Sequence, residues 1–170
     1  PGLTAGTDAA TWTFSGLQNG GRYRVSTTWD EASSGASNAT YTLTGGAAAQ
    51  VAIFNQGLAP DNVANATTGA ITARDTVFAN IGDIYVLTGT TLTVELSAVA
   101  AGRVLADAVR VELIDDAEIK VTQGTTNVQD GGTFDFGTTE TGAPTQITFT
   151  VENEGAQNLT LDAASLATSL

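Results

Sequence analysis

Short segments in which apolar and polar residues alternate run along most of this chain. In the segment 11–14, Trp12 and Phe14 share one face and two threonines share the other. Alternation with a period of two is typical of a β-strand that buries one face. The same pattern predicts further strands at 23–29, 40–43, 50–54, 83–87, 92–96 and 104–114. Residues 57–75 lack it, and we expect a long connection there with room for a short helix.

A second set of strands is predicted after residue 114, with Ile119 and Val121 facing inward. These strands cover 118–122, 134–137, 146–151 and 158–161. An immunoglobulin-like sandwich needs about seven strands over roughly 100 residues. The pattern therefore predicts the first part of such a domain, which is truncated or is completed by another chain.

The charge distribution changes at the same place. Residues 1–114 hold five Arg and nine acids, whereas residues 115–170 hold one Lys and nine acids. We expect a domain boundary here. Residues 1–114 are predicted to form a jelly-roll-like β-sandwich, and residues 115–170 the N-terminal part of an immunoglobulin-like β domain.

The composition disfavours several classes of partner and activity. The net charge of −12 disfavours nucleic acid and anionic membranes as partners. No apolar run reaches the roughly 20 residues that span a bilayer. The chain lacks His and Cys, the commonest general base and the thiol nucleophile. We therefore expect a protein that is not an enzyme.

Two family resemblances follow from particular segments. Residues 8–114 resemble the golvesin C-terminal-like domain, also found appended to bacterial xanthan lyases, through the segments 10–14, 21–29, 38–42 and 105–111. This resemblance implies a jelly-roll, carbohydrate-binding-like module without activity of its own. Residues 117–163 resemble the opening strands of the immunoglobulin-like repeats of Hydin-type and choice-of-anchor surface proteins, through 117–121, 135–137, 149–155 and 159–161.

Asp107 is the first candidate site residue. It is in phase with Leu105 and Val109, so alternation places its carboxylate on the core face. A buried carboxylate has to be paired or hydrogen-bonded. We expect a structural buried carboxylate, with a buried metal or catalytic site as the alternative.

Aromatic residues beside polar loops are candidates for stacking on sugar rings. Trp29 ends a predicted strand next to the loop 30–38, and Asp30 and Tyr41 complete the predicted carbohydrate-binding set. The alternative is that Trp29 and Tyr41 are core aromatics.

Two acidic pairs are candidate calcium ligands: Asp30 with Glu31, and Asp115 with Asp116. Neither follows the EF-hand spacing, and a solvated acidic surface is the alternative. No cofactor other than calcium is predicted.

These observations predict a non-catalytic structural or adhesive segment of a large secreted or cell-surface bacterial protein, or a fibre or filament subunit. The expected partners are the rest of a larger parent chain or neighbouring copies of this chain. The alternative is a carbohydrate-binding module appended to a polysaccharide-degrading enzyme, with a glycan as its ligand.

Overall fold

The computed structural model describes residues 2–3, 9–61, 70–73, 76–128, 133–138 and 146–161. These residues form strands and no helix, so the chain is all-β as the alternation predicts. None of them lies in a helix long and apolar enough to cross a membrane. The chain divides into two compact units, Pro1–Leu113 (unit 1) and Ile114–Leu170 (unit 2). This division lies one residue from the expected boundary.

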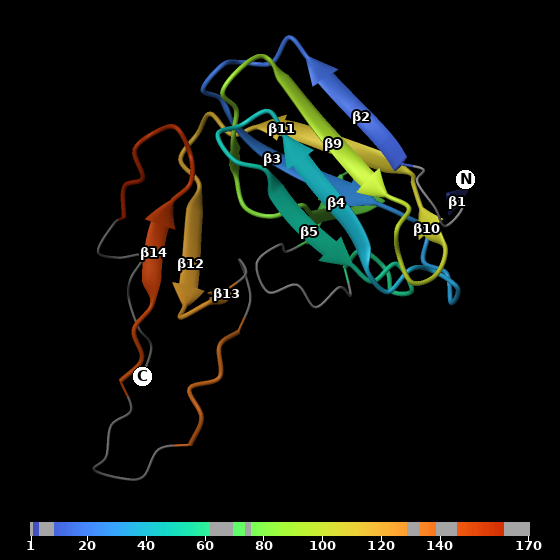
Figure 1. Cartoon of the computed structure of the whole chain (residues 1–170). Coiled ribbons are helices and arrows are strands. Elements are labelled where there is room, and N and C mark those ends of the chain that lie inside the picture. The colour runs from blue at the N-terminus through green and yellow to red at the C-terminus, as the bar shows by residue number, and fades with distance from the viewer. Residues whose placement is uncertain are drawn as a thin grey trace. The chain divides into compact units, whose positions relative to one another are not determined.

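One layer of unit 1 is an antiparallel sheet with the order β2-β9-β4-β5 (Figure 1). Its strands are β2 (Ala9–Ser15), β9 (Thr91–Ser97), β4 (Ala39–Thr44) and β5 (Gln50–Phe54). The register places Trp12 beside Val94 and Val94 beside Leu43, so large apolar side chains line one face. Threonines alternate with them and lie on the other face, as period-two patterning requires.

The second layer has the order β11-β3-β7-β6, with β8 also paired to β3. Its strands are β11 (Ala108–Leu113), β3 (Arg22–Thr28), β7 (Thr76–Asn80), β6 (Ala70–Ala73) and β8 (Tyr85–Val86). Val25 of β3 lies beside Val111 of β11, and Tyr23 lies beside Tyr85. The short strand β1 (Gly2–Leu3) pairs with β10 (Val104–Leu105).

A single apolar core lies between the two layers. Its fully buried side chains come from both sheets and from the loops, among them Val25, Tyr41, Leu43, Phe54, Ile81, Leu92, Val94 and Leu96. Unit 1 is therefore a β-sandwich. The chain crosses between the layers from β2 to β3, from β3 to β4, from β5 to β6, from β8 to β9 and from β9 to β11, which is a jelly-roll-like winding.

Two segments of unit 1 differ from the sequence prediction. The expected connection 57–75 contains β6, which forms a hairpin with β7, a strand that the alternation did not single out. The expected strand 104–114 is interrupted at residues 106–107 and splits into β10 and β11. The interruption matters because it falls at Asp107.

The described residues of unit 2 form one antiparallel sheet with the order β13-β12-β14. Its strands are β12 (Ile119–Gln123), β13 (Thr126–Val128) and β14 (Thr150–Asn153). The predicted strands at 134–137 and 158–161 are not strands in the structure, whereas β13 lies in a stretch predicted to be a polar connection. Among the described residues of unit 2, Ile114 is the one buried side chain.

Candidate functional site

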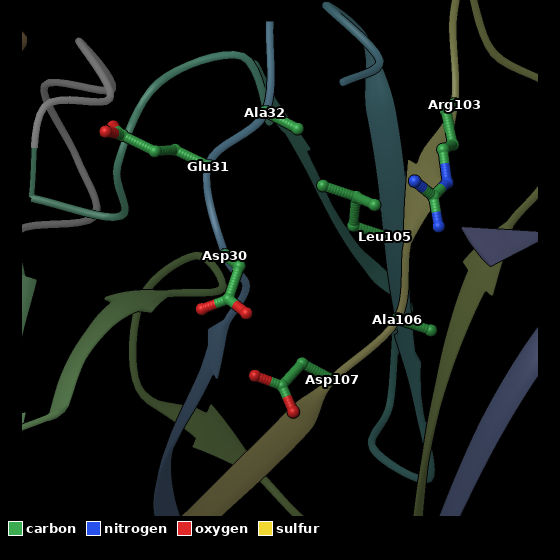
Figure 2. Close-up of a pocket in the computed structure, with 7 residues that line it drawn as sticks. All are labelled: Asp30, Glu31, Ala32, Arg103, Leu105, Ala106 and Asp107. Carbon is green, nitrogen blue, oxygen red and sulfur yellow. The ribbon is translucent and has the colours of Figure 1, made fainter. Parts of the chain in front are cut away.

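A pocket of ≈ 310 Å³ lies in unit 1 beside the ends of β3 and β11 (Figure 2). The segment that follows β3 contributes Asp30, Glu31 and Ala32, and the segment that includes β10 contributes Arg103, Leu105, Ala106 and Asp107. The carboxylates of Asp30 and Asp107 converge, whereas the Glu31 side chain points away from them (Figure 2). This volume is at the small end of the range for ligand pockets.

Gln56 fixes the Leu105 segment of the pocket. Its side chain is fully buried; Oε1 accepts from the backbone N–H of Leu105 at 2.8 Å, and Nε2 donates to the carbonyl of Leu105 at 2.7 Å. The side-chain amide thus makes the two bonds that a neighbouring strand would make. The Gln56 backbone also donates to Ala36 at 2.8 Å and accepts from Ala32 at 3.3 Å. One residue therefore ties both walls of the pocket together.

The loop between β3 and β4 is held directly against the Arg103 segment. Ala36 N–H donates to the Arg103 carbonyl at 2.8 Å, and Arg103 N–H donates to the Ser34 carbonyl at 2.9 Å. Between them, a side chain at Gly35 would meet the Gln56 carbonyl oxygen at 2.5 Å. Glycine is required here because the two backbones approach so closely.

The charged side chains of the pocket are the groups that a ligand would contact. Within the described part of the chain, the side chains of Asp30, Glu31, Arg103 and Asp107 take part in no hydrogen bond or ion pair. Asp30 and Asp107 thus offer two carboxylates, and Arg103 offers one guanidinium, to a ligand. A polyhydroxylated molecule suits such a lining because each hydroxyl can donate to a carboxylate and accept from a guanidinium.

Tyr41 lies close enough to the pocket for Asp107 to affect it. The pKa of Tyr41 is raised to about 12, mainly by burial; the negative charge of Asp107 acts in the same direction, and hydrogen bonds with Thr27 and Gln56 act in the opposite direction. The phenol is therefore neutral at physiological pH. Its role here is structural.

The prediction that Asp107 is buried is wrong. Its side chain is exposed and lines the pocket. Alternation alone placed it on the core face, but the strand is interrupted at residues 106–107. The carboxylate therefore opens into the pocket.

The predicted carbohydrate-binding set is also wrong in its aromatic members. Trp29 is 3% exposed, and its Nε1 donates to the Leu58 carbonyl at 2.8 Å. Tyr41 is fully buried, and both rings pack against Phe54, with centroid distances of 5.4 and 5.7 Å. Neither ring has a free face for a sugar. Asp30 is the one member of the set that lies exposed in the pocket.

The candidate calcium ligands are not gathered into a metal centre. Within the described residues, no group of three or more acidic side chains is placed to hold an ion. Asp30 and Glu31 line the pocket, and Asp115 and Asp116 are exposed. Calcium binding stays a prediction.

A different kind of surface lies on unit 2. The register brings Val121 of β12 beside Val128 of β13 and Val151 of β14, and Ile119 follows on the same face. We call these four residues the apolar face of unit 2. Ile119 is 49% exposed and Val151 is 43% exposed, so half of this face contacts water.

The opposite face of the same sheet is polar and well bonded. Lys120 Nζ lies 3.0 Å from Glu154 Oε1, and both side chains are mostly buried. Asn153 closes the adjoining turn, accepting from Glu118 N–H at 3.2 Å and donating to the Gln157 carbonyl at 2.7 Å.

Three phenylalanines form a second apolar cluster in unit 2. The rings of Phe134, Phe136 and Phe149 contact one another edge to face, with centroid distances of 5.1 to 6.0 Å. Phe136 is 54% exposed. The aromatic residues of unit 2 thus gather without being sealed from water.

No protein-family model, curated protein or solved structure matches this chain. The golvesin-like and Hydin-type resemblances therefore stay predictions. Function has to be inferred from the pocket of unit 1 and the surfaces of unit 2.

Proposed function

We propose that this chain is a non-catalytic structural or adhesive segment of a large secreted or cell-surface protein, and that unit 2 is a point of assembly. The observation that carries the proposal is the half-exposed apolar face of unit 2. Ile119 and Val151 are the side chains that an assembled state would cover.

A single three-stranded sheet needs a covering layer to be stable on its own. Unit 2 has one apolar sheet face and an aromatic cluster, and Ile114 is its one buried side chain among the described residues. Covering such a face removes apolar area from water, worth about 25 cal/mol per Å². Additional strands from the parent protein or from a neighbouring molecule would supply this layer.

Thiol labelling tests the proposal, and the absence of cysteine makes it site-specific. Ile119→Cys places a thiol on the apolar face, and Val99→Cys places one in a loop of unit 1 where the native side chain is 71% exposed. In the dilute chain we expect both thiols to react at similar rates. In the intact protein on its native cells, the thiol at position 119 should react at least tenfold more slowly, and the control should not change. Equal rates at position 119 in both settings would contradict the proposal.

The pocket of unit 1 supports a second candidate function, carbohydrate binding. Asp30, Asp107 and Arg103 offer acceptors and donors around a volume of ≈ 310 Å³. Calorimetric titration with the hits of a glycan screen is the test. Asp107→Asn should weaken binding, whereas Glu95→Gln, on an exposed position of β9, should not. A screen without any binder would remove this candidate.

A further inference from the structure

Two strand edges of this chain are free among the described residues. β14 pairs with β12 on one side, and no described strand lies on its other side. β11 pairs with β3 and likewise ends its sheet. An edge strand presents unpaired N–H and C=O groups and is a template for pairing with another chain.

The two edges have complementary patterns. On β14, Val151 belongs to the apolar face and Glu152 points to the opposite face. On β11, Val111 and its neighbour Val109 pack against the core, and Arg110 points to the opposite face. Pairing β14 with β11 would therefore place valine beside valine and Glu152 beside Arg110, because partners across a ladder share a face.

Charge distinguishes this pairing from the others that the chain offers. The edge strands β2, β5, β6 and β13 contain no Lys or Arg. Pairing of β14 with a second β14 sets Glu152 against Thr150 or against another Glu152, and Lys120, which lies across from Glu152 on β12, already contacts Glu154 at 3.0 Å. Copies of a chain of net charge −12 repel one another, so a local attraction of opposite charges favours one pairing over the others.

Both charged groups are able to make the contact. Glu152 is exposed and has no ion pair within the described part of the chain. Arg110 contacts Glu112 through both terminal nitrogens at 3.0 Å. The guanidinium has five N–H donors in all, so donors are left for a second carboxylate. Arg24 also lies 3.7 Å from Glu112, so two guanidinium groups gather at this carboxylate.

The β11 side of the sandwich is also incompletely covered. Two valines of β11, Val109 and Val111, pack against the core but are only partly buried. The same is true of Trp12 and Phe14 on the edge strand β2. Their counterparts on β5, Ala52 and Phe54, are buried. An added strand next to β11 would bury more of the valine side chains.

We propose that β14 of one copy pairs with β11 of the next copy, with Glu152 beside Arg110, and that repetition of this contact builds an open-ended assembly. The inference rests on the proposed structural function and names its partner as a second copy of this chain. Because the two surfaces differ, the contact is heterologous. A heterologous contact propagates unless its rotation closes a ring.

Charge reversal across the interface is the test, read by light scattering of the full chain over a concentration series at about 0.15 M salt. The wild-type mass should grow past the dimer. Arg110→Glu alone and Glu152→Lys alone should each raise the concentration needed for growth by about five- to tenfold. Glu95→Lys is the matched control on a central strand and should raise it by less than twofold.

Mixing the two reversed chains separates this pairing from its alternatives. Each reversed chain carries like charges on its own two edges, but each edge is complementary to one edge of the other chain. A 1:1 mixture should therefore assemble where neither component does. Thermal melts establish that both variants are folded, and folded variants that fail to assemble when mixed would overturn the proposal.

The remaining outcomes are equally decisive. β14–β11 pairing between copies would be contradicted if the wild-type chain stays monomeric or stops at a closed dimer. It would also be contradicted if β14 pairs with β11 of the same molecule, which would not depend on concentration. If the thiol at position 119 is nevertheless protected in the intact protein, the structural function stands and the partner is a different chain. If that thiol is unprotected, the structural function itself fails.

Discussion

The two units of this chain use the same kind of strand and reach different degrees of burial. In unit 1, inward side chains such as Leu43, Val94 and Leu96 are fully buried between two sheets. In unit 2, Ile119 and Val151 occupy the same kind of position on a sheet and are about half exposed. The strand pattern is alike, and the difference is the presence of a facing layer.

This comparison shows that alternation specifies a strand and its inward face but not the layer that covers it. Backbone pairing fixes the sheet of unit 2, yet apolar burial is the dominant favourable term in folding. We therefore expect unit 2 to open at a lower free energy than unit 1. The predictions below test this difference, from the largest expected effect to the smallest.

Removing one inward side chain from each unit is the most direct test. Leu96→Ala creates a cavity in a sealed core and should lower the free energy of unfolding of unit 1 by about 3–4 kcal/mol. Ile119→Ala removes a side chain that is 49% exposed and should cost about 1 kcal/mol or less. Urea denaturation with hydrogen exchange resolved by unit measures both. Equal costs would show that the face of unit 2 is sealed after all.

A pair of glutamines near the two ends of β5 tests how unit 1 holds its pocket. Gln56→Leu leaves the N–H and C=O of Leu105 without partners and should cost about 3 kcal/mol. Gln50→Leu is the control, because Gln50 Oε1 is buried without a hydrogen bond and its loss should cost less than about 1 kcal/mol. Denaturant midpoints give both values. A similar cost at both positions would exclude a special role for Gln56.

How far the sequence predicts these features depends on the range of the interactions involved. The strands β2, β4 and β9 could be predicted because alternation is local and their inward residues are large. The boundary near residue 114 could be predicted from charge and strand pattern together. The half-exposed face of unit 2 follows from the small number of strands predicted there.

The pocket could not be predicted, because its parts meet only in three dimensions. Asp30 and Asp107 are far apart in the sequence, and the interruption of the strand before β11 has no Gly or Pro to mark it. The burial of Trp29 could not be predicted, because Phe54 and the Leu58 carbonyl, which contact its ring, are distant in the sequence. Gln56 gave no signal, because a polar residue after a strand usually indicates a turn.

Alkaline pH tests the sealed core of unit 1 through Tyr41. Burial raises the pKa of its phenol from 10.0 to about 12 in the folded state. A raised pKa means that the stabilisation is fully present below pH 10 and is lost as the pH rises from 10 to 12, because the unfolded chain releases its proton first. The loss should reach about 2–3 kcal/mol. The Tyr41→Phe variant keeps Tyr23 and Tyr85 and should lack this part of the loss of stability. The free energy of unfolding is measured against pH for the wild type and the variant, and the difference between the two profiles isolates the contribution of Tyr41.

The smallest effect is expected from a change that fills space in the turn of unit 2. Gly155 lies against the backbone of the segment 116–118: Glu154 N–H donates to the Glu118 carbonyl at 2.7 Å, and Ala156 N–H donates to the Asp116 carbonyl at 3.1 Å. A side chain at Gly155 would collide with the Asp116 carbonyl oxygen and would meet the Glu118 nitrogen at 2.5 Å. Gly155→Ala should therefore cost about 1–2 kcal/mol, because the turn can open without disturbing a buried core.

Gly89→Ala is the control for this change, because nothing lies within 4 Å of the added carbon. It should alter stability by no more than about 0.5 kcal/mol. Hydrogen exchange should show the Gly155→Ala effect in β12 and β14 alone, with the strands of unit 1 unchanged. If the exchange of unit 1 rose as well, the two units would unfold together, and the contrast between a sealed and an open sheet would not divide the chain into separate folding units.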